Sequence, residues 1–252
     1  MISARDTMSG LAKGLAVIET FTADRPRQSI AEVSAACGLD RATARRCLLT
    51  LAQKGYAEYD GKFFTLTPRV LRLGTACLAT MPLPQVVQPF LERLSEALGE
   101  SSSVSILDED EIVYVARAAQ RKVMSIALMP GSRLPAFCTS MGRVLLAALP
   151  EDEARRRLTR RVLVARTART VTGVDAVMAR LADVRAQGFS VNDEEVELGL
   201  RSIAVPVRNG RGVTVAALNL GLPVRGEDAA TLPGRYLPAL LQVQAELRQV
   251  LR

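Results

Sequence analysis

Three short stretches near the start of the chain place apolar residues at helical spacing. Residues 14–21, 29–38 and 40–55 each repeat an apolar side chain about every third or fourth position, the pattern of a helix with one buried face. Gly38 and Gly55 stand at the ends of the second and third stretches, where glycine commonly terminates a helix. Three short helices, the last two joined by a glycine turn, predict a helix-turn-helix.

Local signals sharpen this prediction. Ser29 and Glu32 have the spacing of a capping box, in which the hydroxyl accepts an orphan N–H group and the carboxylate reaches back to the cap amide. Residues 56–66 have the pattern of two short strands around Asp60-Gly61, a pair that favours a two-residue type I′ turn. A hairpin directly after these helices predicts a winged helix-turn-helix.

A further helical pattern separates this region from the rest of the chain. It begins at Pro68 and ends before Pro82 and Pro84, whose rings disfavour a continuing helix. We therefore expect a winged helix-turn-helix DNA-binding domain at residues 1–67, a linker helix at residues 68–81, and a second domain at residues 82–252.

The region after the prolines mixes both periodicities. Its pattern predicts, in order, a helix at 85–98, strands at 103–107, 112–118 and 123–128, helices at 140–149, 151–158 and 172–188 (the last capped by Thr172), strands at 203–207 and 213–220, and a helix from 236 to the C-terminus. Strands grouped on either side of a block of helices predict an α+β domain built on an antiparallel sheet.

The third predicted helix opens with small, hydroxyl and guanidinium groups. Asp40 can cap this helix, and an exposed helix start of this composition suits base edges and phosphates. The candidate DNA-binding residues, including one in the helix before and one in the wing, are Ser29, Arg41, Ala42, Thr43, Arg45, Arg46 and Lys62. The alternative is a solvated helix face and a solubilising lysine in the turn.

Composition narrows the classes of function. The formal net charge is +7, and residues 1–75 hold +4 of it (eleven basic and seven acidic residues), which favours a polyanionic partner for this part of the chain. Histidine is absent, which removes Ser-His and Cys-His nucleophile pairs and His-ligated zinc. We therefore expect no enzyme, no cofactor and no metal.

Cysteine usage and hydropathy indicate the compartment. Cys37, Cys47, Cys77 and Cys138 lie far apart without a C-x-x-C pair, so we expect buried, reduced thiols. The chain shows neither a signal-peptide pattern nor an apolar run long enough to span a membrane. These features predict a cytoplasmic protein.

Charged clusters in the second half have two interpretations each. Arg155, Arg156 and Arg157 follow three acidic residues, so an exposed charged helix is favoured over a second nucleic-acid site. The acidic group Asp193, Glu194, Glu195 and Glu197 is expected to be solvated rather than to bind a cation. Arg133 could pair with a ligand carboxylate or form a surface salt bridge.

Several longer stretches resemble one family. They are GLAVIETF from Gly14, LTPRVLRLG from Leu66, RLPAFCTSMGRVLLAALP from Arg133 and ELGLRSIAVPV from Glu197. Together with the helix-turn-helix they resemble the IclR family of bacterial transcriptional regulators over nearly the whole chain. Within that family the chain looks most similar to regulators of aromatic-acid catabolism through protocatechuate and 4-hydroxybenzoate, the β-ketoadipate pathway branch.

The resemblance implies a fold and an assembly. It implies a winged helix-turn-helix, a linker helix used in dimerisation and a C-terminal GAF-like effector domain, in dimers or tetramers. It places effector-binding residues at Leu134, Phe137, Ser140, Met141, Gly142, Asn192, Ser202, Asn219 and Gly221. Backbone N–H groups at the helix that starts near Ser140 suit a carboxylate.

At four of these positions the chain departs from the residue common in the family. Asn192 stands where the family often has an acidic residue, Ser202 where it often has Cys, and Asn219 and Gly221 where it often has Ser. Hydroxyl and amide groups at these positions still suit a polar small acid.

The expected function is a DNA-binding transcriptional regulator of a catabolic operon that responds to a small aromatic or related carboxylic acid. Its expected partners are double-stranded operator DNA, the acid and further copies of the chain, and contact with RNA polymerase is compatible with this role. Two alternatives remain open: a small-acid-processing enzyme that uses the C-terminal domain, and an architectural DNA binder without a sensor role.

Overall fold

A computed structural model describes residues 6–22, 24–74, 82–120 and 128–251. The chain divides into two compact units, Met1–Thr80 and Met81–Arg252. The end of the predicted linker helix, with Cys77, and all but the last residue of the strand predicted at 123–128 lie outside the described residues.

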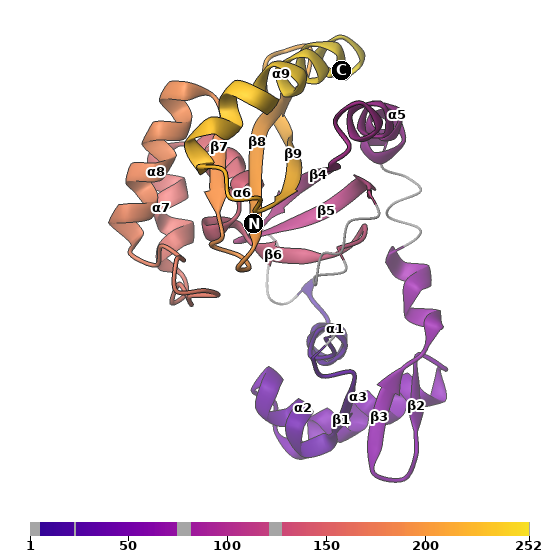
Figure 1. Ribbon diagram of the computed structural model, residues 1–252. Coiled ribbons are helices and arrows are strands. Elements are labelled where there is room, and N and C mark those ends of the chain that lie inside the picture. Colours follow the sequence, from indigo (N-terminus) through magenta and orange to yellow (C-terminus); the bar gives the residue numbers. More distant parts are fainter. Residues whose placement is uncertain (1–5, 23, 75–81, 121–127, 252) are drawn as a thin grey trace. The chain divides into compact units, whose positions relative to one another are not determined.

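The first unit is a small three-helix fold with a three-stranded sheet (Figure 1). Its elements are α1 (Ser9–Glu19), β1 (Arg27–Ser29), α2 (Ile30–Cys37), α3 (Arg41–Gln53), β2 (Ala57–Tyr59) and β3 (Phe63–Leu66). In the described part of this unit the strands pair antiparallel in the order β1-β3-β2. The winged helix-turn-helix prediction is confirmed, although α1 begins earlier than expected and β1 was not expected.

The predicted capping signals all form. Ser29 Oγ accepts the Glu32 N–H at 3.4 Å while the Glu32 carboxylate accepts the Ser29 N–H at 2.7 Å. Asp40 Oδ1 accepts the Thr43 N–H at 2.9 Å. Gly38 ends α2 with φ +67°, a left-handed conformation that glycine adopts at little cost. These contacts fix where α2 ends and α3 begins.

The wing turn differs from the predicted type. Asp60 N–H donates to Phe63 O at 3.2 Å, so Gly61 and Lys62 are the two central residues of the turn, one position later than predicted. Gly61 has φ +102°, and Lys62 is not among the residues with positive φ. A type I′ turn needs positive φ at both central positions, so that prediction is wrong. Asp60 instead uses its carboxylate to accept the Lys62 and Phe63 N–H groups.

After the wing, a 3-10 helix η2 (Pro68–Val70) leads into helical residues 71–74. Thr67 caps it, because its hydroxyl accepts the Arg69 N–H at 3.2 Å. This segment is the described beginning of the predicted linker helix.

The second unit is built on one antiparallel sheet. Its elements are α5 (Pro82–Leu98), β4 (Ser101–Asp108), β5 (Glu111–Ala118), β6 (Arg133–Pro135), η3 (Ala136–Cys138), α6 (Ser140–Ala147), α7 (Glu151–Thr159), α8 (Val174–Gln187), β7 (Ser190–Asp193), β8 (Leu200–Arg208), β9 (Thr214–Pro223), η4 (Ala229–Thr231) and α9 (Leu232–Val250). The strand order over the described residues is β6-β5-β4-β9-β8-β7. The predicted α+β class is confirmed.

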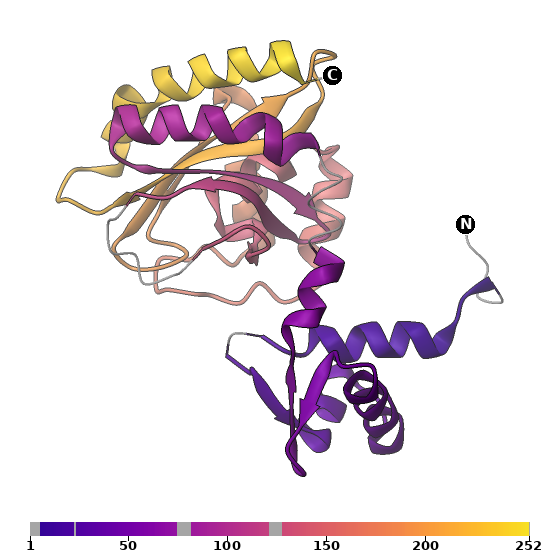
Figure 2. The ribbon, with the colours of Figure 1, turned by 90° about the vertical axis from the view of Figure 1, so that its right-hand side faces the viewer.

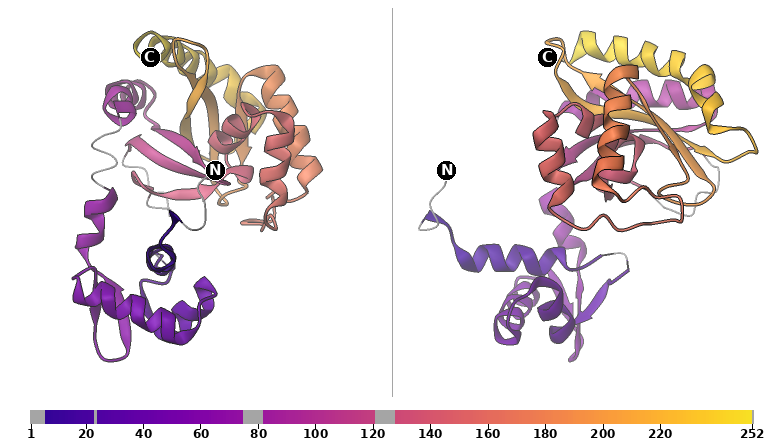
Figure 3. Two further views of the ribbon diagram at one scale, coloured as in Figure 1. Left: turned by 180° about the vertical axis from the view of Figure 1, so that it is seen from behind. Right: turned by 90° about the vertical axis from the view of Figure 1, so that its left-hand side faces the viewer.

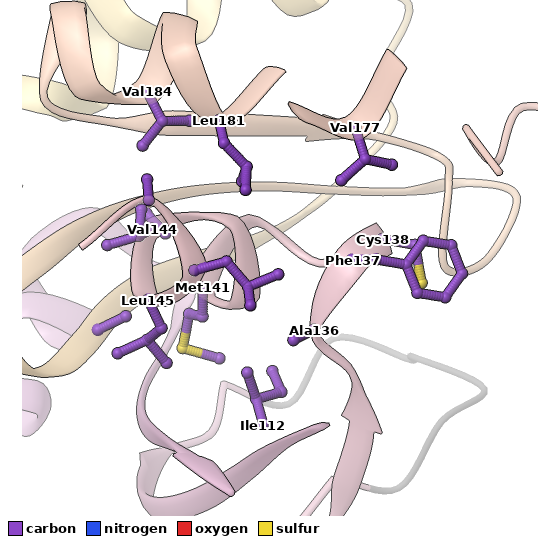
Figure 4. Close-up of a cluster of buried hydrophobic side chains, with 14 of the residues drawn as sticks. Ile112, Ala136, Phe137, Cys138, Met141, Val144, Leu145, Val177, Leu181 and Val184 are labelled. Atoms are coloured by element: carbon purple, nitrogen blue, oxygen red, sulfur yellow. The ribbon is translucent and has the colours of Figure 1, made fainter. Parts of the chain in front are cut away.

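Helices cover both faces of this sheet (Figures 1 and 2). On one face α5 and α9 lie side by side (Figure 3), and Arg93 on α5 pairs with Glu246 on α9 at 2.6 Å. On the other face α6, α7 and α8 pack around a second apolar cluster (Figure 4). Because side chains alternate along a strand, Ile203 and Val205 on β8 join the α5 and α9 cluster, whereas Ala204 joins the α6 cluster.

Three element predictions need correction. Helix α5 begins at Pro82 rather than Gln85, because a proline in the first turn lacks only an N–H group that a helix leaves unbonded there. Thr172 does not cap α8: Gly173 is the cap residue and makes no side-chain cap bond. The short strands β6 and β7 were missed, since three or four mixed residues form a strand here only through their sheet partners.

None of the helices of the described residues reaches both the length and the apolar character of a membrane span.

Candidate nucleic-acid interface and ligand cavity

The start of α3 presents the predicted cationic groups. Four candidate residues are exposed, namely Arg41, Ala42, Arg45 and Arg46. Thr43, expected to be exposed, is instead buried at 7% exposure. Its backbone N–H is bonded to the Asp40 cap and its hydroxyl accepts Arg46 Nη2 at 3.3 Å. Thr43 therefore lies on the inner side of α3 and holds Arg46 in place.

The other two candidates lie at the end of β1, where Ser29 caps α2, and in the wing. Ser29 is half-buried, and both its hydroxyl and its N–H group are engaged with Glu32 in the capping box. Lys62 is exposed at the wing tip, with its ammonium group 5.0 Å from the centre of the Phe63 ring. Lys62 therefore remains accessible, whereas Ser29 mainly has a structural role in this unit.

Arg27 on β1 was not singled out from the sequence. Its guanidinium stacks 4.1 Å from the centre of the Phe63 ring and pairs with Asp60 at 2.5 Å. The backbone N–H of Phe63, followed by the Arg27 guanidinium, holds the pKa of Asp60 well below its usual range. The Asp60 carboxylate therefore stays ionised and keeps the wing turn closed. A strand predicted at residues 27–29 would have drawn attention to Arg27, but the sequence pattern did not reveal β1.

In the second unit a small cavity lies between the start of α6 and the sheet. Its volume is about 30 Å³, room for one or two water molecules. Seven of the nine predicted effector residues line it together: Leu134, Ser140, Met141, Asn192, Ser202, Asn219 and Gly221. The first and last of these residues, Leu134 and Gly221, are 87 positions apart in the chain, and the fold brings them to the same cavity.

Strand register explains why the polar members share a face. Asn192, Ser202 and Gly221 are direct cross-strand partners on β7, β8 and β9. In the adjacent row, Asn219 on β9 is opposite Ser103 on β4, and Ser103 is opposite Arg117 on β5. Residues directly opposite on neighbouring strands point to the same side of a sheet. The two rows therefore form a polar floor under the start of α6.

The remaining two predicted residues do not line this cavity. Phe137 lines a separate cavity of about 170 Å³, together with Pro135 of β6 and Leu158 of α7, and Figure 4 shows its ring apart from Met141. At Gly142 an added Cβ would lie 2.1 Å from the carbonyl oxygen of Ala136, well inside van der Waals contact. Gly142 thus allows α6 to pack directly against η3 rather than contacting the cavity.

Hydrogen bonds connect the cavity wall to its surroundings. The hydroxyls of Ser140 and Ser202 are 2.7 Å apart. Arg117 Nη1 donates to Ser103 Oγ at 3.2 Å. Asn192 Nδ2 donates to Cys138 O at 2.6 Å. Asn219 contrasts with these groups, because its buried Oδ1 has no hydrogen-bond partner within the described part of the chain.

Sequence reasoning missed half of the lining. The additional residues are Ser103, Tyr114, Arg117, Leu128, Thr139, Val196 and Leu200. Arg117 is the one charged side chain among the described lining residues. Burial raises the pKa of Tyr114 to about 12, so its phenol stays protonated. The alternation Ser101, Ser103, Ser105 was the available signal, because it places three hydroxyls on one face of a strand.

The acidic loop after β7 does not match its predicted solvated state. Glu195 is buried at 7% exposure, and Arg143 on α6 at 2%. The two form a bidentate pair with N–O distances of 2.6 and 2.7 Å, and Glu195 also accepts the Val171 N–H. Glu195 N–H in turn donates to Asn192 Oδ1 at 3.3 Å. The pair therefore links α6 to the loop behind a cavity residue.

The other charged clusters are surface features. Arg155 pairs with Asp175, and Arg156 and Arg157 pair with Glu153, so the exposed charged helix is confirmed. Arg133 pairs with Glu111 at 2.7 Å and with Asp108 at 2.8 Å on the surface. Of its two interpretations, the structure shows the surface salt bridge.

The cysteines within the described residues are free thiols. Cys138 is buried, and that burial raises the pKa of its thiol to about 11. Cys37 and Cys47 are only half-buried, so the expectation of full burial is wrong for these two.

Comparison with known proteins connects both sites to one family. The model of the IclR helix-turn-helix domain matches residues 10–61, and the model of the bacterial transcriptional regulator IclR C-terminal domain matches residues 75–243. The chain belongs to the IclR family. It is therefore a DNA-binding transcriptional regulator, and the enzyme alternative is wrong.

Relatives of this IclR-family regulator include the Pca regulon regulatory protein of Pseudomonas putida, 44% identical over 96% of this chain and 84% of that protein. A putative transcriptional regulator from Rhodococcus has a similar structure, with a TM-score of 0.77 and 45% identity over 97% of this chain and 98% of that one. The inducer-binding domain of a PobR double mutant from Acinetobacter, solved with 3-hydroxybenzoic acid, matches with a TM-score of 0.63 and 34% identity over 67% of this chain and 98% of that one. The regulator is thus related to regulators of aromatic catabolism.

Proposed function

We propose that this regulator controls a catabolic operon in response to a small aromatic carboxylic acid that binds in the cavity between α6 and the sheet. The observation that carries the proposal is the composition of the lining: one arginine, several hydroxyls and apolar side chains such as Leu134 and Met141. A few placed polar groups in an apolar wall are typical of small-molecule sites. The complex of the related inducer-binding domain with 3-hydroxybenzoic acid supports the same ligand class.

The carboxylate of the acid has two kinds of partner here. Arg117 supplies a full positive charge. It is itself partly buried, and this burial lowers the pKa of its guanidinium. The first N–H groups of α6, at Ser140 and Met141, point out of the helix start, while Thr139 caps the Gly142 N–H at 3.0 Å. An anion is stabilised at such a helix N-terminus. A cavity of about 30 Å³ must widen to admit an aromatic ring, so binding includes movement of lining side chains.

DNA binding is assigned to the first unit, residues 1–67 in our proposed division, followed by a linker at 68–81 and the effector domain at 82–252. Arg41, Arg45 and Arg46 on α3 are the proposed major-groove contacts and Lys62 the proposed wing contact. Either Arg45→Ala or Arg46→Ala should weaken operator binding by ~1–3 kcal/mol, measured by fluorescence anisotropy. Unchanged affinity in both variants contradicts the assignment of α3.

Self-association as a dimer or tetramer is supported by unpartnered apolar side chains in the first unit. Met8, Leu11 and Leu15 on and before α1 are 76%, 61% and 47% exposed, and Leu71 and Leu73 after the wing are 69% and 53% exposed. Leu11 and Leu15 are four positions apart on α1 and share a face of it, and exposed apolar surface favours association. A dimer in the cytoplasm would bring two α3 helices to two operator half-sites.

The proposed mechanism is a shift in population. An acid that binds one arrangement of the dimer more tightly than another favours that arrangement by the ratio of the two affinities. The spacing of the two α3 helices, and with it the operator affinity, then follows the acid concentration. RNA polymerase is a further partner compatible with this role.

A thermal-shift screen with benzoate, 4-hydroxybenzoate and protocatechuate tests the proposal, because a ligand that binds only the native state raises its stability. We expect at least one aromatic acid to raise Tm and to change operator affinity. Operator binding with no response to any carboxylic acid would favour an architectural role instead.

A further inference from the structure

Among the described residues that line the cavity, Asn219 is the one with a buried side-chain acceptor atom that no donor reaches. Asn219 is 7% exposed, and its Oδ1 is buried without a partner among the described residues. A buried carbonyl oxygen without a donor is unfavourable unless something else supplies that donor. The position of Asn219 in the cavity lining indicates where the donor would come from.

None of the described side chains in the sheet around Asn219 donates to its Oδ1. Its cross-strand partner on β8 is Ala204, and its neighbours two positions away on β9 are Ala217 and Gly221. Ser103, its partner on β4, lies close to Arg117 and accepts a hydrogen bond from it. Alanine and glycine offer no side-chain hydrogen bond, and Asn219 and Gly221 both line the cavity.

The balance of donors and acceptors describes that occupant. Of the two hydroxyl hydrogens of Ser140 and Ser202, only one is used in their mutual bond, and Ser103 accepts from Arg117 while its own hydrogen remains available. The described wall thus offers several donors, which suit a carboxylate, and one carboxamide oxygen, Asn219 Oδ1, that is buried without any donor. A ligand that satisfies both must carry acceptors and at least one donor.

We propose that the effector carries a hydroxyl group and that Asn219 binds it, so the regulator selects hydroxylated aromatic acids over acids of the same shape without a hydroxyl. The proposal rests on the proposed function, in which an aromatic carboxylic acid fills this cavity. A hydroxyl fits a carboxamide in either orientation of the amide, because it donates to Oδ1 and accepts from Nδ2. A keto or second carboxylate group at this place would leave Oδ1 unpaired.

Space beside Asn219 agrees with a ring substituent. At Gly221 an added Cβ would have its nearest neighbour, Ser101 O, at 3.9 Å, an ordinary contact distance. Glycine is therefore not required by packing at this position, and its missing side chain leaves room next to the open carboxamide.

Isothermal titration calorimetry of the full-length protein with matched acids tests the proposal. The pair 4-hydroxybenzoate and 4-methylbenzoate compares a hydroxyl with a methyl group of similar size, and 3-hydroxybenzoate with 3-methylbenzoate does the same at the neighbouring ring position. We expect the hydroxylated acid of at least one pair to bind about tenfold more tightly or better. The corresponding methoxybenzoate, which accepts but does not donate, should bind like the methyl compound.

Asn219→Leu completes the test, since leucine keeps a branched side chain without hydrogen-bonding atoms. The hydroxyl preference should fall to about twofold or less in this variant, and Asn219→Ser, which retains an acceptor, should keep most of it. Equal binding of hydroxylated and methylated acids by the wild-type protein overturns the proposal, as does a preference that survives Asn219→Leu. Tighter binding of adipate than of any hydroxybenzoate would also overturn it.

The two levels of the argument fail differently. If benzoates bind without regard to the hydroxyl, the proposed function stands and the role of Asn219 is wrong. If no aromatic acid binds at all while operator DNA still binds, the proposed function itself is wrong.

Discussion

Both faces of the six-stranded sheet bury polar side chains, but one such side chain on each face differs in its hydrogen bonding. Under α5, Ser102 is fully buried, and its hydroxyl donates to Leu91 O at 2.9 Å while its N–H donates to Ser95 Oγ at 3.0 Å. Under α6, Asn219 is nearly as buried, and its Oδ1 has no partner in the described structure. Buried polar groups that serve the fold are normally hydrogen-bonded, and the open Oδ1 of Asn219 is the exception that our proposal assigns to a ligand.

The largest expected effect comes from the ion pair behind the open face. Arg143→Met leaves the Glu195 carboxylate buried without its partner, and breaking such a pair by removing one member costs ~3–5 kcal/mol. Urea unfolding measures the loss. Arg133→Met is the matched control, because it breaks an exposed pair with Glu111 and Asp108 and should cost less than ~1 kcal/mol. Similar small losses in both would mean that the open face does not depend on this pair.

A second test uses two adjacent residues that point to opposite faces. Ser202→Leu places an apolar side chain in the cavity and should weaken binding of the acid by ~1.4 kcal/mol or more, a factor of ten, with operator affinity unchanged. Ile203→Val removes one methyl group from the closed face and should lower stability by ~0.5–1.5 kcal/mol, with affinity for the acid unchanged. Titration of both variants with the same acid checks the contrast, and an acid affinity unaltered by Ser202→Leu would move the site elsewhere.

Ser102→Ala examines the closed face. It removes the hydroxyl that bonds Leu91 O and leaves Ser95 Oγ with fewer partners, so we expect a loss of ~1–2 kcal/mol. Thermal or urea unfolding gives the value, and the affinity for the acid should not change. A neutral result would show that the network between α5 and β4 contributes little to stability.

The smallest effect has the opposite sign. Asn219→Leu removes the open acceptor, so without ligand it should leave the free energy of unfolding unchanged or raise it by up to ~1 kcal/mol. The free energies of unfolding of Asn219→Leu and Ser102→Ala, measured under the same conditions, compare the two faces in one experiment. A clear destabilisation by Asn219→Leu would indicate that this amide already serves the fold.

The sequence was informative where local chemistry decides the structure. The capping box of Ser29 and Glu32 and the cap at Asp40 depend on residues three positions apart, and both form as predicted. Family resemblance placed seven residues that the structure brings into one cavity. That grouping depends on strand register. The family resemblance included the grouping, whereas the periodicity of the sequence alone did not predict it.

Partners distant in the chain could not be predicted in the same way. Glu195 stands in an acidic run that looks solvated, and only its contact with Arg143, 52 positions earlier, makes burial favourable. Arg117 lines the cavity because β5 pairs with β4 in a particular register. That register shifts at an irregularity between Val104 and Ser105. Thr43 is buried since the rotation of α3 against the rest of its unit, and not the polarity of the residue, sets its environment.

Two glycines assigned to the effector site by resemblance have different evolutionary freedom. Gly142 is fixed, because even a methyl group would collide with the backbone of Ala136. Gly221 tolerates a methyl group by distance, so a single substitution there can reduce the space for the ligand without rebuilding the sheet. If the effector fills this cavity as we propose, substitutions at Gly221 can change the size of the acid that fits, while Gly142 keeps α6 packed against η3.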